Sequence, residues 1–153
     1  MTDPKRAPSY LDALNAIALI EKRAHEFYLA WADRTSDPEL ARVMRFVALR
    51  EIEHTFAFQK RICELGYEFK ESPHPQCDEW LRLFRSNASD LEKFRGFGFK
   101  DPERAPQDDF ADLFKDRTLD PQTGALLGRY IAEERDSANM FLKVYARMVK
   151  EDA

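Results

Sequence analysis

A glutamate and a histidine, Glu51 and His54, stand where a helical pattern calls for apolar side chains. The mostly apolar positions on the same helical face are Leu40, Val43, Met44, Val47, Thr55, Phe58, Ile62 and Leu65. A Glu-x-x-His step places both side chains on one face about one turn apart, which is the spacing used in metal sites of helix-bundle cores. Because a buried carboxylate without a partner is costly, the pattern predicts a compensating metal, an ion pair or a dense set of hydrogen bonds.

Two further glutamates interrupt apolar stripes in the same way. Glu21 lies in a stripe formed by Leu14, Ile17, Ala18, Ala24, Tyr28, Trp31 and Ala32. Glu134 lies in a stripe formed by Leu127, Tyr130, Ile131, Ala138, Phe141, Tyr145 and Met148. Its neighbour Glu133 points about 100° away on a helix, so we expect Glu133 to lie outside the core. Each of three long helices therefore contributes one acidic residue near its middle.

The helices that position these residues are bounded by start and stop signals. Three long helices are predicted, over residues 9–34, 36–66 and 120–151. Their expected N-caps are Ser9, Ser36 and Asp120, because serine and aspartate side chains accept hydrogen bonds from the first free backbone N–H groups. The second helix is expected to end at Gly66, a residue typical of helix C-termini.

The first two helices are joined by a very short loop, so residues 9–66 are predicted to form an antiparallel hairpin. With the turn centred at residues 35 and 36, position 35 − n faces position 36 + n, which places Glu21 opposite residues 50 and 51. Two carboxylates buried side by side repel and raise the pKa of one of them unless a cation lies between them. The alternative for Glu21 alone is a half-exposed residue paired with Lys22 or Arg50.

Residues 67–119 are predicted to form an irregular connection with short helices. One short helix is expected over residues 78–84, with Trp80, Leu81 and Phe84 as its apolar face. Another is expected over residues 107–115, with Phe110, Leu113 and Phe114 as its packing face. Residues 96–99 show no regular pattern. His74 stands between two prolines and is expected to be an exposed loop residue rather than a metal ligand.

Composition restricts the class of protein. The chain has 153 residues, of which 44% are hydrophobic and 34% charged, so one domain with its own core is expected. A net charge of −4 gives no basic surface for nucleic acid. No apolar run approaches the roughly 20 residues that span a bilayer, and the first residues lack an apolar signal core, so a cytoplasmic protein is expected. Cys63 and Cys77 form no Cys-x-x-Cys motif and are expected to be reduced thiols.

The glutamate-bearing segments resemble a known family. Residues 21–28, 36–40 and 51–54 resemble the first half of a rubrerythrin-type ferritin-like di-iron carboxylate protein, and residues 130–141 resemble its third helix. The resemblance does not cover residues 67–119. It implies an all-α, ferritin-like antiparallel bundle in which two helices each give one Glu and two others each give Glu-x-x-His to two iron ions.

Transferred to this sequence, the resemblance makes Glu21, Glu51, His54 and Glu134 the candidate metal ligands, with Glu51 as the bridging carboxylate. A fourth helix with its own Glu-x-x-His is expected after residue 153, and neither His25 nor His74 stands in such a motif.

Three explanations are open for the missing Glu-x-x-His. The sequence is truncated; or another chain supplies the fourth helix; or two hairpins pair as a homodimer, as in the two-helix ferritins of encapsulin compartments. Paired hairpins would supply four glutamates and two histidines, leaving Glu134 as a spare or outer carboxylate. A homo-oligomer is therefore expected. His25 is interpreted as a packed or hydrogen-bonded histidine.

The resemblance implies that the protein reacts Fe(II) with dioxygen or peroxide, in iron handling or in defence against oxidative stress, as a ferroxidase or a peroxidase-like oxidoreductase. Carboxylates and imidazole suit iron and manganese, and zinc is a further option. Tyr28 and Tyr130 are candidate outer hydrogen-bond donors. Because the chain lacks a four-thiolate iron site, peroxidase turnover would need an external electron donor.

Two alternatives stand beside this hypothesis. One is a metal-free helical interaction module, in which the buried glutamates pair with Arg50, Arg129 or Arg135. The other is a mononuclear or zinc site at Glu51 and His54 without redox chemistry.

Overall fold

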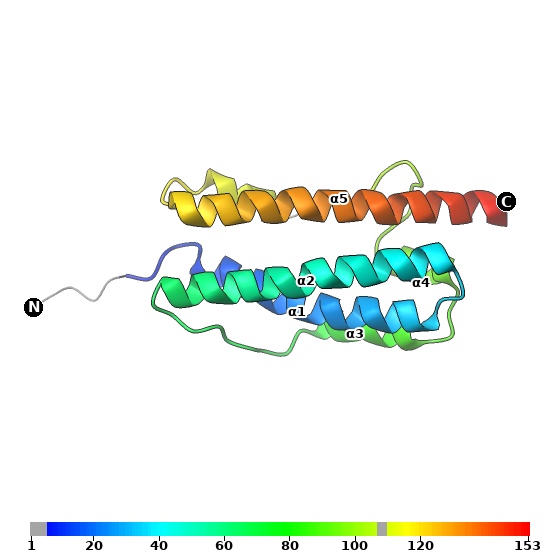
Figure 1. The fold of residues 1–153 in the computed structure, drawn as a ribbon, viewed down its shortest axis with the longest axis horizontal. Coiled ribbons are helices and arrows are strands. Elements are labelled where there is room, and N and C mark those ends of the chain that lie inside the picture. Colours follow the sequence, from blue (N-terminus) through cyan, green and yellow to red (C-terminus); the bar gives the residue numbers. More distant parts are fainter. Residues whose placement is uncertain (1–5, 107–109) are drawn as a thin grey trace, which may run out of the picture.

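The computed structural model describes residues 6–106 and 110–153, and within these residues the secondary structure is entirely helical. The elements are α1 (Leu11–Arg34), α2 (Pro38–Glu64), α3 (Pro75–Arg85), α4 (Asp90–Gly96), the 3₁₀ helix η1 (Phe110–Lys115) and α5 (Pro121–Asp152). Figure 1 shows the three long helices running side by side. The predicted all-α class is therefore confirmed. The elements follow one another as a long hairpin, a connection with short helices and a long C-terminal helix.

Helices α1 and α2 form the predicted antiparallel hairpin, but the helix starts are displaced from the predicted N-caps. The N-cap of α2 is Asp37, not Ser36, because the Asp37 side chain accepts a 2.9 Å hydrogen bond from the backbone N–H of Leu40. The N-cap of α1 is Tyr10, not Ser9. The hydroxyl of Ser9 instead donates to Asp116 across a distance of 2.5 Å, so a tertiary contact takes up the group that the sequence assigns to capping.

Helix α5 lies along α2 (Figure 1). Side-chain hydrogen bonds join the two helices near both ends. At one end the buried Arg61 of α2 donates to Thr123 and to Asp120, each across 2.9 Å. Asp120 is also the predicted N-cap of α5, because it accepts from the backbone N–H of Thr123. At the other end Arg147 of α5 donates to Asp37 across 2.8 Å. These contacts fix how α5 is placed lengthwise against the hairpin.

The connection between α2 and α5 contains more helix than the sequence pattern indicates. Helix α3 begins at Pro75, and its N-cap is the half-buried His74, whose Nδ1 accepts from the backbone N–H of Cys77, so the expectation of an exposed loop histidine is wrong. Helix α4 was not predicted, although Ser89 and Glu92 form a capping box at its start.

The helix predicted over residues 107–115 is described from Phe110 onward as η1, and residues 107–109 lie outside the described residues. Phe110 and Leu113 are partly buried against the helical core. Phe114 is 49% exposed, so its assignment to the packing face is wrong.

The hydrophobic core has two parts. The larger part contains the aromatic side chains of α1, α3, α4 and the following segment, with ring contacts such as Trp31 against Phe84 at a centroid distance of 4.4 Å. The smaller part lies toward the N-terminal ends of α1 and α5 and contains Ile17, Phe58 and Tyr130. On each long helix the acidic residues singled out by the sequence fall between these two parts. Both cysteines are free thiols, as predicted, and no described helix has the length and apolar character needed to cross a membrane.

Candidate metal centre

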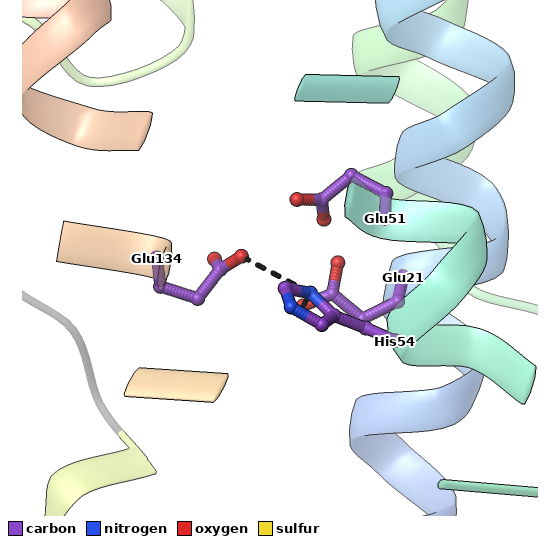
Figure 2. A group of neighbouring side chains, drawn as sticks. All are labelled: Glu21, Glu51, His54 and Glu134. Carbon is purple, nitrogen blue, oxygen red and sulfur yellow. Dashed lines mark ion pairs between the residues drawn. The ribbon is translucent and has the colours of Figure 1, made fainter. Parts of the chain in front are cut away.

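The structure brings together the four residues selected from the sequence (Figure 2). Glu21 comes from α1, Glu51 and His54 from α2, and Glu134 from α5. Each residue offers one ligand atom, and these four atoms all lie within 4.8 Å of one another. The facing of Glu21 and Glu51 follows from the hairpin register, and the Glu-x-x-His spacing places Glu51 and His54 on the same side of α2.

Helix α5 runs lengthwise along the side of the hairpin that carries this cluster, and its Glu134 completes the group within one chain. A symmetric pairing of two hairpins through this face would require α5 to move away. The described arrangement therefore uses Glu134 as a member of the cluster rather than as a spare carboxylate.

Burial makes the cluster electrostatically unusual. Glu21, Glu51 and His54 are between 1% and 3% exposed, and the side chain of Glu134 is 29% exposed. Among the described residues, Oε2 of Glu21 has no hydrogen-bond partner, and no arginine or lysine forms an ion pair with Glu21 or Glu51. Burial raises the pKa of Glu21 well above its ordinary value, and the negative charge of Glu134 raises it further. A cation between these carboxylates would remove both penalties.

The two ring nitrogens of His54 face different groups. Nδ1 lies 3.8 Å from Oε1 of Glu134 and 4.0 Å from Oε1 of Glu21. Nε2 lies 3.4 Å from Oε1 of Glu133. Burial lowers the pKa of His54, against the opposing effect of the Glu133 carboxylate. Burial thus favours the neutral imidazole, which is the form that binds a metal.

The position of Glu133 corrects a prediction, because this residue was expected to lie outside. Its side chain is 21% exposed, which makes it as buried as that of Glu134. The buried face of a bundle helix is at least about 100° wide, and a long glutamate side chain at its edge can bend inward. Arg129, one turn before Glu133, lies 3.4 Å from Glu133 Oε1 on the outer side. This i,i+4 pair can be read from the sequence, but it does not indicate that the Glu133 side chain bends toward His54.

In the metal-free alternative, arginines would pair with the buried glutamates. The contacts described for Arg50 and Arg129 are with other residues. Arg50 forms an ion pair with Asp136 at 2.8 Å and donates to Ser137 across 3.0 Å. Arg129 contacts Glu53 and Glu133. These contacts do not neutralise Glu21 or Glu51. His25 donates from Nδ1 to the carbonyl of Ala48 across 2.8 Å, in keeping with its interpretation as a hydrogen-bonded histidine.

Two buried tyrosines border the cluster. The ring of Tyr130 meets the His54 ring edge-on at a centroid distance of 5.1 Å. Burial raises the pKa of the Tyr130 phenol, and the negative charges of Glu21 and Glu134 add to this effect. Burial, Glu134 and Glu21 likewise raise the pKa of Tyr28. Both phenols therefore stay protonated at neutral pH and remain hydrogen-bond donors beside the carboxylates.

The donor set fits a divalent transition metal. Three carboxylates and one neutral imidazole carry a formal charge of −3, and oxygen donors with one imidazole suit Fe(II), Mn(II) and Zn(II). The four ligand atoms lie close enough together to surround one ion. Glu133 is a further carboxylate at the edge of the group.

Comparison of the chain with protein-family models, with curated proteins and with solved structures finds no match in any of the three. The function is therefore inferred from the geometry and electrostatics of the cluster.

Proposed function

We propose that this protein is a non-haem iron carboxylate protein of the ferritin-like type, in which Glu21, Glu51, His54 and Glu134 hold iron, or manganese in its place. Its activity would be the reaction of Fe(II) with dioxygen or peroxide, in iron handling or oxidative-stress defence. The observation that carries the proposal is the meeting of three glutamates from three helices around a buried carboxylate oxygen, Glu21 Oε2, that has no hydrogen-bond partner among the described residues.

Each residue of the cluster would have its own role in holding the metal. Glu21 and Glu134 approach from α1 and α5, and Glu51 of α2 is suited to a bridging position. The Nδ1 atom of His54 faces Glu21 and Glu134 and would bind the metal from there. Tyr130 provides a protonated phenol beside the cluster, and this phenol lowers the pKa of Glu21, which partly offsets the effect of burial. When bound, iron would supply a Lewis acid and one-electron redox chemistry.

The proposal includes room for a second ion. One divalent cation leaves a formal charge of −1 on the three carboxylates, so the group still attracts positive charge. A second ion would draw on Glu51 as a shared ligand and on the nearby Glu133. It would complete the di-iron arrangement that the sequence resemblance implies, within a single chain.

Metal uptake tests the proposal directly. Anaerobically purified protein is loaded with Fe(II), desalted and measured by elemental analysis, beside the variants Glu51→Gln and Glu53→Gln. The two substitutions remove the same charge two residues apart on α2, but Glu53 lies on the exposed side. We expect stoichiometric iron in the wild type and in Glu53→Gln, and loss of iron in Glu51→Gln. Equal iron in all three proteins would refute the assignment.

A metal-free interaction module remains the second candidate, because α2 carries exposed apolar side chains. Phe46, Leu49 and Phe56 are between 41% and 66% exposed and lie on the outer face of α2. A homo-oligomer formed through this face would bury them. Sedimentation of the wild type and of Leu49→Glu, each with and without Fe(II), separates the candidates. Association that depends on Leu49 in protein unable to bind metal would favour the interaction module.

A further inference from the structure

A hollow lined by aromatic side chains lies directly beside the carboxylate cluster. Its volume is about 260 Å³, and Glu51 and Glu134 form part of its wall. The aromatic part of the wall consists of Tyr28, Trp80, Phe97, Phe99 and Phe141. A second hollow of about 300 Å³ shares Tyr28, Glu51, Trp80, Phe97 and Glu134 with the first and also includes Glu21. The cluster therefore borders a continuous set of apolar surfaces.

The aromatic wall is held in place by contacts outside the cluster. Trp80 and Phe97 meet edge-on at a centroid distance of 4.8 Å, and Tyr28 lies 5.3 Å from Phe141. Edge-on ring pairs stabilise one relative orientation. The rings come from α1, α3, α5 and the segment after α4, so several elements of the fold combine to shape this space.

The hollow is larger, and its wall is more apolar, than the binding of iron and dioxygen alone requires. An apolar cavity of about 150 Å³ already holds benzene, whereas dioxygen or peroxide would occupy a small fraction of that volume. A hydrated cation gains little from an aromatic wall compared with a polar channel. A small organic molecule, in contrast, buries most of its surface in a space of this kind, with a few polar groups to orient it.

Charge restricts the class of molecule further. Glu51, Glu134 and Arg135 all line the hollow, so its wall carries two carboxylates and one guanidinium. The net charge of the wall is negative and would oppose an anionic group placed next to the two glutamates. Ser137 also lines the hollow, and its hydroxyl already accepts a hydrogen bond from Arg50. The lining therefore favours an uncharged ring system over a carboxylate or a phosphate.

We propose that this hollow binds a small, uncharged organic molecule of one or two rings beside the carboxylate cluster. This inference rests on the proposed metal-binding function for its biochemical meaning, because the molecule would lie next to the metal as the organic ligand of that centre. The binding itself depends on the hollow alone and can be measured in metal-free protein.

Fluorine NMR of added fluorobenzene tests the inference. We expect its resonance to broaden with metal-free wild-type protein and the broadening to be reversed by excess benzene. The anion 4-fluorobenzoate should bind at least about tenfold more weakly, because the carboxylates of Glu51 and Glu134 outnumber the guanidinium of Arg135 in the lining. No broadening by the wild type, or equal affinity for the anion, would overturn the inference.

Substitutions locate the binding within the molecule. Ala138 lines the hollow, whereas Ala132 on the same helix is exposed. Ala138→Phe should fill the space and weaken fluorobenzene binding about tenfold or more, and Ala132→Phe should leave it unchanged. Should circular dichroism show that Ala138→Phe does not fold, Phe97→Ala serves as the second variant. This substitution enlarges the hollow, so the affinity of the protein for 1-fluoronaphthalene should rise relative to its affinity for fluorobenzene. An unchanged affinity in Ala138→Phe, or an unchanged ratio in Phe97→Ala, would overturn the inference.

Parallel metal measurements separate the two proposals. Ala138→Phe leaves the four candidate ligands in place and should keep its iron. His54→Ala removes a candidate ligand that does not line the hollow, so it should lose iron and keep fluorobenzene. Iron uptake without fluorobenzene binding would overturn this inference alone. Fluorobenzene binding without iron uptake would refute the proposed function and leave the hollow as a binding site.

Discussion

Nε2 of His54 lies 3.4 Å from Oε1 of Glu133, while the other ring nitrogen faces the Glu21 and Glu134 carboxylates. Histidines that bind metals commonly donate their second N–H group to a carboxylate, which fixes the tautomer and the orientation of the ring. Nε2 of His54 has no hydrogen-bond partner among the described residues, and Glu133 is close enough to accept one from it after a small movement of either side chain. Glu133 would act as a positioning residue that keeps Nδ1 free to bind a metal.

Replacing Glu133 with glutamine should therefore weaken metal binding without abolishing it. We expect Glu133→Gln to lower Mn(II) affinity roughly 10- to 100-fold at unchanged stoichiometry, as measured by titration calorimetry. Nitrogen-15 NMR of the His54 ring in metal-free protein should show a change in tautomer. Asp136→Asn removes a charge from the same helix, at a residue paired with Arg50, and serves as the control. Equal loss of affinity in both variants would contradict a positioning role for Glu133.

The cluster itself could be predicted because helical periodicity controls which residues are buried. Glu21, Glu51, His54 and Glu134 each replace an apolar residue at a core position, and the short hairpin loop fixes the level at which Glu21 meets Glu51. Glu133 was missed because periodicity gives the direction of the Cα–Cβ bond. It does not show how a long side chain bends at the edge of a buried face.

The connection between α2 and α5 could be predicted only in outline, because tertiary contacts determine it. Helix α4 has seven residues, too few to be stable alone. It is held by Phe94, which packs against Trp31, and by the buried Lys93, which donates to the carbonyl of Phe84. Nothing in the local pattern indicates that a lysine caps a neighbouring helix. The aromatic hollow was missed for the same reason, since its wall is assembled from distant segments.

Removing the charge of Glu21 should stabilise the metal-free protein. The carboxylate is 1% exposed and lies near Glu134, so burial and repulsion both oppose its ionised form. We expect Glu21→Gln to raise the free energy of unfolding at pH 7 by about 1 kcal/mol or more, measured by urea denaturation in the presence of a chelator. Glu26→Gln, on the exposed side of α1 beside Arg85, should change it by less than about 0.5 kcal/mol. Destabilisation by Glu21→Gln would show that the buried charge is already compensated.

Asp120 should contribute stability that is lost in acid. Its carboxylate accepts hydrogen bonds from Tyr10, Thr123 and Arg61, and these contacts, that of Tyr10 above all, hold its pKa below the ordinary value of 3.8. A lowered folded-state pKa means that the stabilisation is complete above the unfolded value and falls as pH drops below it. Asp120→Asn should cost about 1 to 2 kcal/mol at pH 7, and the difference from wild type should shrink below about pH 4.

Urea denaturation between pH 2.5 and pH 7 measures this pH dependence of Asp120. Asp33→Asn, at a surface ion pair with Arg45, is the control and should show little pH dependence of its own. A difference between Asp120→Asn and wild type that stays constant across this range would mean that the charge of Asp120 contributes nothing to stability.

Gly98 should be necessary for the aromatic wall, whereas Gly124 should be replaceable. Gly98 has a φ of +109°, which side-chain-bearing residues rarely adopt, and a Cβ there would meet only Pro106 at an ordinary 3.7 Å. Gly98→Ala should therefore destabilise the protein through its backbone alone, by about 1 kcal/mol or more. Because Gly98 separates Phe97 from Phe99, both of which line the hollow, the variant should also weaken fluorobenzene binding.

Gly124 lies within α5, where a Cβ would meet Leu119 at an ordinary 3.7 Å. Gly124→Ala should therefore raise the free energy of unfolding by about 0.5 to 1 kcal/mol. Urea denaturation of the two variants should give opposite signs, and a shared sign would show that the backbone at Gly98 is free to adopt another conformation.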